Sequence, residues 1–403
     1  MRFFRDLLLA ALATCVVLAL LEGLLRLAHV HYQASLYENE NERGYALRPN
    51  AAGWETEEAD VYVQINSDGW RDRERPIARP PHTLRVAVVG SSETTAREVA
   101  LDDTFEAVMS RDLTRDLAAR GWQADVLNFG VPGYTYSQEY LTLQNHVWKY
   151  QPQVVILLFS SWPVLKTVRS FYPGELKGAP VYVVENGKLL PDAITRAAPP
   201  IDRRRQVWKN RTSDWMNKSY LASLLNAASI KAKEFVVGLP TRFRRSAPAG
   251  PAPSAVAQRA ARLSYNPDLP ETQEAWSIAE AFFKAMKEDC DKHGAEFWIV
   301  LADQEMQVTP DLAARAAFQQ SIELPSLDAV DQRMERFGAA QGIPVLALAK
   351  PLSDYALAHK AYLHGAANSP EHSGHWNEVA NAQVGHAIAR ELEARSALLR
   401  VLN

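Results

Sequence analysis

The stretch that decides the fold is Val86-Ala87-Val88-Val89-Gly90-Ser91-Ser92-Glu93-Thr94. The run Leu84–Val89, apolar except for Arg85, ends at Gly90, which is typical of a strand buried on both faces of a parallel sheet. The turn that follows presents Ser92. A serine after a strand is most often a helix cap or a turn residue, so its meaning depends on what else reaches the same edge.

Strands and helices alternate along the rest of the chain. This rhythm predicts an α/β fold, a three-layer flavodoxin-like parallel sheet with helices on both faces. We expect strands over residues 125–128, 154–159, 296–301 and 344–348, and helices over 103–119, 137–149, 220–236, 271–293 and 376–395. Between about residues 165 and 270 the rhythm breaks. There Val181–Val184 and Lys188–Leu190 flank Glu185-Asn186-Gly187 as a predicted β-hairpin inside an insertion.

The N-terminus predicts a membrane anchor. Leu7–Leu25 is almost continuously apolar, interrupted only by Glu22, and Arg2 and Arg5 precede it. Its length approaches the roughly 20 residues that a helix needs to cross a bilayer, and the preceding positive charge predicts a cytoplasmic N-terminus. The alternative is a cleaved signal peptide, but the apolar run continues past the usual length and no Ala-x-Ala site leads into a polar start.

Three regions follow from these patterns: an anchor over residues 1–30, an extracytoplasmic stalk over 31–83, and a domain over 84–403 that carries the insertion. The stalk contains one predicted strand, Val61–Ile65, and the turn residues Asn66–Gly69. The net charge of −3 argues against a nucleic-acid binder. The chain has two cysteines, Cys15 and Cys290, which excludes a disulfide framework.

A second segment, Ser373-Gly374-His375-Trp376-Asn377, offers a histidine just before the last predicted helix. Ligands of open parallel sheets bind beyond the carboxyl ends of the strands. Ser92, Gly133 and the residues after Phe159 all follow strands and should converge at that edge. Together with His375 they suggest a nucleophile and its base.

Other groups of residues have a simpler interpretation. His372 and His375 could face one metal, but no carboxylate or cysteine cluster completes such a site in the sequence, so we expect loop histidines, no metal and no cofactor. We interpret the basic runs Arg203–Arg205 and Arg242–Arg245 as solvent-exposed surface; the alternative is that they contact an acidic glycan or a lipid headgroup. Trp376 is expected in the core.

The order of these motifs resembles the SGNH/GDSL hydrolase superfamily, particularly its membrane-anchored bacterial branch. The resemblance begins at the anchor, includes Asn66-Ser67-Asp68-Gly69-Trp70-Arg71-Asp72, and extends to the final helix. The family's Gly-Asp-Ser block is similar to Gly90-Ser91-Ser92, which implies that Ser92 is the nucleophile.

The resemblance also covers two later blocks. Asn128-Phe129-Gly130-Val131-Pro132-Gly133-Tyr134 is similar to the block that supplies an oxyanion-hole glycine, which points to Gly133. The family's last block, Asp-x-His, is similar to Ser373-Gly374-His375, which implies that His375 is the base. The backbone N–H groups of Ser92 and Gly133 would form the oxyanion hole.

Two family positions are changed. The Asn of the third block is missing from Phe159-Ser160-Ser161-Trp162-Pro163, where a hydroxyl of Ser160 or Ser161 or the indole N–H of Trp162 could substitute. Ser373 stands where the family has the acid that orients the histidine. Loss of that acid can cost about ten-thousandfold in rate. A backbone carbonyl, Glu371 or an acid from another loop could hold His375 instead.

The resemblance therefore implies a membrane-anchored ester hydrolase or O-acyltransferase without a cofactor. Its expected place is the bacterial inner membrane, as a single-pass protein whose C-terminal domain lies in the periplasm, and its substrate an acylated cell-surface glycan or a small ester. The alternative is a catalytically impaired relative that binds glycans or scaffolds an envelope assembly.

Overall fold

The computed structural model describes residues 2–168, 178–238, 253–370 and 372–401. A five-stranded parallel sheet forms its centre, in the spatial order β11-β10-β7-β5-β6. From the β6 edge this reads second, first, third, fourth and fifth along the chain, which is the flavodoxin-like order and confirms the predicted fold class. The strands are β5 (Thr83–Gly90), β6 (Gln123–Gly130), β7 (Val154–Phe159), β10 (Glu296–Leu301) and β11 (Val345–Ala347).

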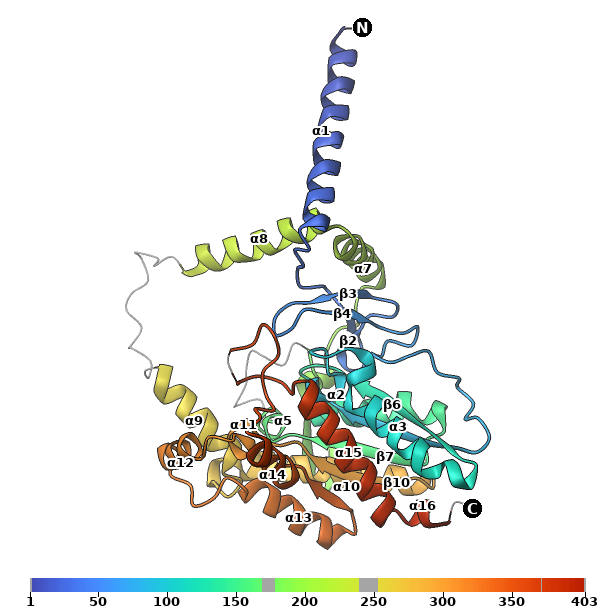
Figure 1. The fold of residues 1–403 in the computed structure, drawn as a ribbon, viewed down its shortest axis with the longest axis vertical. Helices are drawn as coiled ribbons and strands as arrows, with labels where there is room; N and C mark the ends of the chain where they lie inside the picture. The colour runs from blue at the N-terminus through green and yellow to red at the C-terminus, as the bar shows by residue number, and fades with distance from the viewer. Residues whose placement is uncertain (1, 169–177, 239–252, 371, 402–403) are drawn as a thin grey trace.

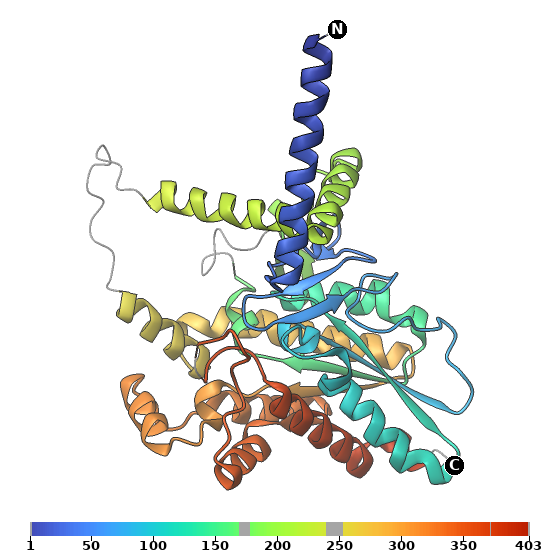
Figure 2. The same ribbon diagram turned by 45° about the horizontal axis from the view of Figure 1, so that its top comes forward.

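Helices cover both faces of this sheet (Figures 1 and 2). Successive β5 side chains point to opposite faces, so Val86 and Val88 join one core and Ala87 and Val89 the other. The first core is completed by α3 (Phe105–Leu117), α14 (Ala349–His359) and α15 (Glu378–Arg395), and the second by α4 (Tyr136–Thr142), α10 (Gln273–Lys292) and α13 (Ala329–Gln341).

The element boundaries differ from the predicted ones where local geometry intervenes. The last helix begins at Glu378 because the side chain of Asn377 caps it, accepting the N–H of Ala380 at 3.0 Å. Trp376 precedes the helix and is buried in the core, as expected. The predicted helix over 137–149 is α4 followed by a π turn (Leu143–Val147) and a 3-10 turn (Trp148–Tyr150).

Residues 31–83 contribute far more structure than the one predicted strand. They form two antiparallel pairs, β1 (Tyr37–Glu40) with β2 (Gly44–Leu47) and β3 (Ala52–Glu55) with β4 (Val61–Gln64). Buried apolar side chains of this segment, Leu36, Leu47, Val63, Ile65 and Trp70, belong to the same core as α10. The segment therefore packs as part of the domain's core.

The described part of the insertion adds no strand to the central sheet. The predicted hairpin is present, with a turn at Asn186 and Gly187 that both have positive φ, as a two-residue type I′ loop requires. The run Arg242–Arg245 lies outside the described residues. The elements here and at the edges of the fold are β8 (Tyr182–Glu185), β9 (Lys188–Pro191), α5 (Trp162–Leu165), α6 (Ala193–Arg196), α7 (Arg203–Lys218), α8 (Tyr220–Gly238), α9 (Pro253–Tyr265), α11 (Glu305–Val308), α12 (Leu312–Ser321) and α16 (Ala397–Val401).

The N-terminal helix α1 (Arg2–Leu27) projects from the rest of the molecule, and none of its residues is buried (Figure 1). It is long and apolar enough to cross a membrane by length and composition. The strands β2, β3 and β4 lie between α1 and the central sheet (Figure 1).

The turn after β5 packs closely against the last residues of β5 and β6. The short helix α2 (Ser92–Thr95) crosses the end of β6 so closely that a Cβ at Gly130 would lie 2.5 Å from the backbone nitrogen of Thr95. A Cβ at Gly90 would collide with the side chain of Thr94. Glycine at both strand ends is therefore what lets α2 sit at this position.

We expect Gly130→Ala to lower the free energy of unfolding by about 1–3 kcal/mol, the usual cost of forcing an extra group into a packed site. The added methyl would meet the α2 backbone and not a flexible side chain. Thermal unfolding of the full chain in detergent measures the effect. Gly23→Ala is the matched control, because a Cβ at Gly23 meets nothing within 4 Å. Equal unfolding midpoints for the two variants would contradict this account.

Candidate active site

Ser92 is the first residue of α2, so its N–H is among the first-turn donors that have no intrahelical acceptor. The turn is fixed from below by Arg71, whose guanidinium donates to the carbonyls of Thr95 at 2.9 Å, Ala96 at 2.5 Å and Val99 at 2.5 Å. Arg71 is 1% exposed, and burial lowers its pKa to about 10. It therefore remains charged at neutral pH and holds the turn that carries Ser92 in place.

Asn128, near the end of β6, holds the same turn from another side. Its amide donates to the carbonyl of Thr94 and, at 3.1 Å, to the carboxylate of Glu106, while its oxygen accepts the N–H of Gly130 at 2.8 Å. The segment Asn66–Asp72 and the block that begins at Asn128 thus share one physical role, which is to position α2.

His375 is held by Glu58, a residue that the sequence did not single out. One carboxylate oxygen of Glu58 lies 2.9 Å from Nδ1 of His375, and the other accepts the backbone N–H of His375 at 2.9 Å. Burial opposes ionisation, but the N–H and positive charge of His375 lower the pKa of Glu58 below its usual value. An ionised acid bound to Nδ1 fixes the tautomer and the orientation of the imidazole.

The loop that carries Glu58 joins β3 to β4 and docks on the loop before His375. Asn368 donates its backbone N–H to the Glu58 carbonyl at 2.8 Å and its side-chain amide to the Ala59 carbonyl at 2.7 Å. Ser369 donates its hydroxyl to the Glu58 carboxylate at 3.3 Å. These contacts make the region before β4 a structural part of the histidine site.

A buried polar cluster supports the other side of the histidine loop. His364 contacts the carbonyl of Gly374 at 2.7 Å through Nδ1 and the carboxylate of Asp303 at 2.8 Å through Nε2. The indole of Trp376 donates to the other oxygen of Asp303 at 2.8 Å. The carboxylate of Asp303 raises the pKa of His364 to about 9 in spite of burial. His375 is thus flanked on both sides by residues that are tied to the sheet.

Two more carboxylates act on the same site. Glu98 is buried, with one oxygen 3.5 Å from Nδ1 of His375, and burial raises the pKa of Glu98. Glu93 accepts the Ser92 hydroxyl at 3.0 Å. Burial disfavours the imidazolium of His375, but nearby acids, Glu93 foremost, raise the pKa of this histidine above its usual value. Among the hydrogen bonds of the described residues, that of the Ser92 hydroxyl runs to Glu93 and none joins it to His375.

Glu58, Glu98 and His375 each offer a ligand atom, and these atoms lie within 4.8 Å of one another, a donor set that could take a metal ion. However, Nδ1 of His375 already contacts Glu58 directly. A metal ligand would instead present its nitrogen lone pair to the ion. The observed contact is a hydrogen bond or ion pair between an imidazole and a carboxylate. His372, the other histidine considered for a metal, stacks on Tyr362 with ring centroids 3.4 Å apart.

Gly133 lies in the turn after β6 with φ of +80°, a conformation that favours glycine. A Cβ there would approach the hydroxyl of Tyr45 to 3.0 Å. Tyr45 donates that hydroxyl to the Pro132 carbonyl at 2.9 Å, and Tyr134 donates its own to the Tyr45 carbonyl at 2.8 Å. Residues 31–83 therefore position this turn as well as α2 and His375.

The positions predicted to replace the missing family residues lie after β7 and in the loop before His375. The carbonyl of Ser160 accepts the Tyr136 hydroxyl at 2.5 Å, and the carbonyl of Ser161 accepts the N–H of Val164 at 3.2 Å. Trp162 is 38% exposed at the start of α5. Ser373 donates its backbone N–H to Pro370, and the described partners of the His375 ring are Glu58 and Glu98. Glu371 lies outside the described residues.

A cleft of about 650 Å³ adjoins this site at Gly133. Residues 31–83, the loop after β7 and the insertion helix α7 all contribute to its walls. Its lining includes Tyr37, Tyr45, Arg97, Gly133 and Lys209.

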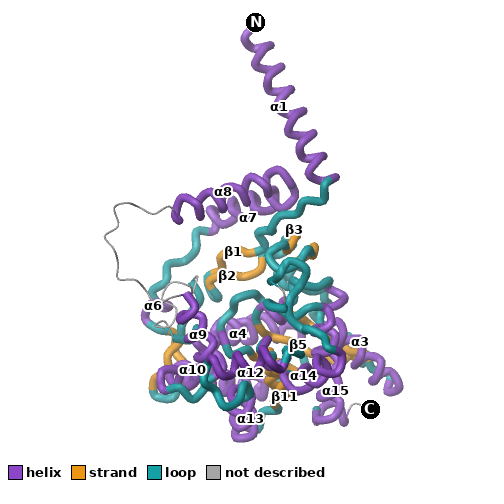
Figure 3. Tube along the Cα trace, turned by 60° about the vertical axis from the view of Figure 1, so that its left-hand side comes forward, coloured by secondary structure: helices purple, strands orange, loops and turns teal. Residues whose placement is uncertain are grey.

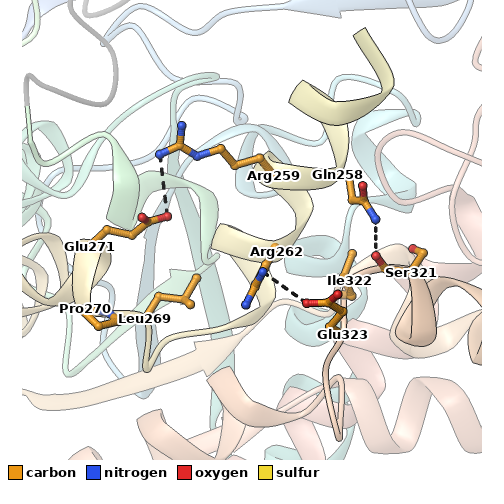
Figure 4. A pocket seen from close by; sticks show the side chains of 9 residues that line it. All are labelled: Gln258, Arg259, Arg262, Leu269, Pro270, Glu271, Ser321, Ile322 and Glu323. Atoms are coloured by element: carbon orange, nitrogen blue, oxygen red, sulfur yellow. Dashed lines mark hydrogen bonds and ion pairs between the residues drawn. The ribbon is translucent and has the colours of Figure 1, made fainter. Parts of the chain in front are cut away.

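Another pocket, of about 570 Å³, lies between α9 and the end of α12 (Figure 4). Its charged side chains pair with one another, as in Arg262 with Glu323 at 3.5 Å and Arg259 with Glu271 at 3.8 Å. It contains none of the predicted site residues.

Comparisons with known proteins give weak likenesses. No protein-family model matches the chain, and no curated protein does. Among solved structures, the chain is similar to an acetyl xylan esterase (10% identity, 76% of this chain and 99% of the other, TM-score 0.38). It is also similar to a catalytic mutant of an acetylxylan esterase from Geobacillus stearothermophilus (8%, 76% and 93%, 0.37). A third is a lipase/acylhydrolase from Enterococcus faecalis (14%, 77% and 96%, 0.33). Since these scores are low, the fold class rests on the strand order of the sheet.

Proposed function

We propose that this protein is an SGNH-type ester hydrolase in which Ser92 is the nucleophile, His375 the general base and Glu58 the acid that orients the base. The observation that carries the proposal is the double contact of Glu58 with the backbone N–H and with Nδ1 of His375. Because Nδ1 is occupied by Glu58, Nε2 is the ring nitrogen that can accept the proton of the Ser92 hydroxyl when substrate is bound. An acid from a distant loop thus fills the role that Ser373 cannot.

The reaction would proceed through an acyl-enzyme. His375 takes the proton of Ser92 through Nε2 as the serine oxygen attacks the ester carbonyl, and Glu58 stabilises the imidazolium that forms. The N–H groups of Ser92 and Gly133 bind the oxyanion. The protonated base then gives its proton to the leaving alcohol, and water repeats the sequence to release the acid. The Ser92 hydroxyl must first turn from Glu93 towards His375, a rearrangement that substrate binding commonly brings about.

The substrate class follows from the cleft and the anchor. The cleft is lined by the aromatic residues Tyr37 and Tyr45 and by the basic residues Arg97 and Lys209, a mixture that suits an acylated glycan. If a sugar hydroxyl replaces water in the second step, the same residues perform O-acyl transfer. With α1 in the membrane and Arg2 and Arg5 on the cytoplasmic side, the domain would face the periplasm of a bacterium.

Labelling by a fluorophosphonate tests the nucleophile. We expect the full-length protein to be labelled and Ser92→Ala to lose the label together with acetyl-ester turnover, by about 10³-fold or more. Ser91→Ala is the matched control and should retain both, because Ser91 is the neighbouring serine on the same turn. If the wild-type protein is neither labelled nor active, the protein is instead a non-catalytic glycan-binding or scaffold protein.

The role of Glu58 is tested by the pH profile of Glu58→Gln. The base must be neutral, so wild-type kcat/KM falls as the pH drops through the raised pKa of His375. Without the Glu58 carboxylate the imidazolium is less stable, so the acid limb should move to lower pH while kcat/KM at its plateau falls by about 10²–10⁴-fold.

The control for this experiment is Asp60→Asn, which removes an exposed carboxylate from the same loop. Asp60 contacts His31 at 2.6 Å and not His375, so the acid limb should stay in place. A Glu58→Gln enzyme whose activity falls without movement of the acid limb would reduce Glu58 to a purely structural residue.

A further inference from the structure

The insertion helix α7 has an inward face that is unusually polar. Asn210 donates to the Glu38 carboxylate at 2.5 Å, and Asp214 pairs with the buried Arg48 at 2.8 Å. Asn217 donates to the carbonyls of Ser35 and Ala52 at 3.0 and 3.1 Å. Polar contacts therefore attach this face of α7 to the strands of residues 31–83.

The outward face carries a stripe of aromatic and basic side chains at heptad-like spacing. Its members are Arg204, Trp208, Arg211, Trp215 and Lys218, all of them exposed. Steps of four and three residues place them on one side of the helix. Trp208 is 73% and Trp215 64% exposed. A surface helix normally directs its aromatic side chains inward, so this reversed arrangement indicates a surface with a binding partner.

The position of α7 points to a bilayer as that partner. The helices α7 and α8 lie crosswise at the end of α1 from which the chain leaves the candidate span (Figures 1 and 3). Because the inward face of α7 binds residues 31–83, its outward stripe faces away from the domain.

Glu22, the acid within the apolar run of α1, fixes this arrangement. It accepts the N–H groups of Tyr220 and Leu221 at 3.1 and 2.9 Å and the hydroxyl of Ser219 at 3.0 Å, which caps the start of α8. Arg26 donates to the carbonyl of Lys218 at 2.7 Å. The anchor and the insertion are thus hydrogen-bonded to each other at the level where α1 ends.

We propose that α7 and α8 form an interfacial platform that lies on the membrane surface. Trp208 and Trp215 would occupy the headgroup region, where tryptophan is enriched. Arg204, Arg211 and Lys218 would face anionic lipid. The composition of α7 fits this role, since it has six Arg and Lys residues against one Asp. Leu225 of α8, 61% exposed, extends the surface.

Quenching of tryptophan fluorescence by lipids brominated near the headgroup tests the platform. The full-length protein is reconstituted into phosphatidylcholine vesicles with or without phosphatidylglycerol. We expect bromolipid to quench part of the wild-type emission, more so with phosphatidylglycerol and less so at high salt. The double variant Trp208→Phe/Trp215→Phe should lose the quenched part.

The matched control is Trp122→Phe, since Trp122 directly precedes β6 and its ring contacts His82, outside α7 and α8. It should leave the quenched part of the emission unchanged. Wild-type protein that inserts into vesicles but shows no quenching assigned to Trp208 and Trp215 would overturn the proposal. Light scattering in detergent tests whether the stripe instead binds a second copy of the chain. A wild-type dimer that becomes a monomer in the double variant would show that it does, and would overturn the proposal.

Discussion

The buried guanidinium of Arg71 is the constraint on which the rest of the site depends. A charge in an apolar interior is tolerated only when its hydrogen bonds are satisfied, and Arg71 achieves this with three carbonyls of the α2 turn. These carbonyls belong to the last residue of α2 and to the turn that follows it, and the Ala96 carbonyl also accepts the N–H of Val99 at 3.3 Å. Arg71 and the turn that carries Ser92 therefore depend on each other, and residues 31–83 are a structural requirement of the candidate site as well as a link to α1.

The same segment sets the electrostatics of the site. Arg97 pairs with Glu55 at 2.6 Å beneath the loop of Glu58, so cations and acids alternate through a largely buried network. The pKa values of two glutamates in this network shift in opposite directions. Burial opposes the ionisation of Glu58, but hydrogen bonds and charge from His375 lower its pKa, whereas burial raises the pKa of Glu98. Divergent environments for neighbouring carboxyl groups are typical of sites that handle protons. Glu58 is thus the acid of the pair that stays ionised.

The sequence predicts the central sheet well because β7 and β10 are almost continuously apolar, and both match their predicted limits. The strands β5 and β6 each end at a glycine, which marks where they stop. Three of the four strands in residues 31–83 are not predicted, because they have four residues each and little apolar alternation. Glu58 is not predicted for a different reason. It lies 317 positions from His375, in a loop with several acids, and no local pattern marks which acid a distant loop will contact.

The helix α7 was also not predicted, because its sequence shows no apolar periodicity. The face that packs on the rest of the protein is polar, and the exposed face carries Arg and Trp. This reversal also connects the platform to the site. Lys209, next to Trp208, lines the cleft at Gly133, so the helix that would rest on lipid also forms part of the wall of this cleft. A cleft built in this way would lie close to the bilayer surface, within reach of an acyl donor or acceptor held in the membrane.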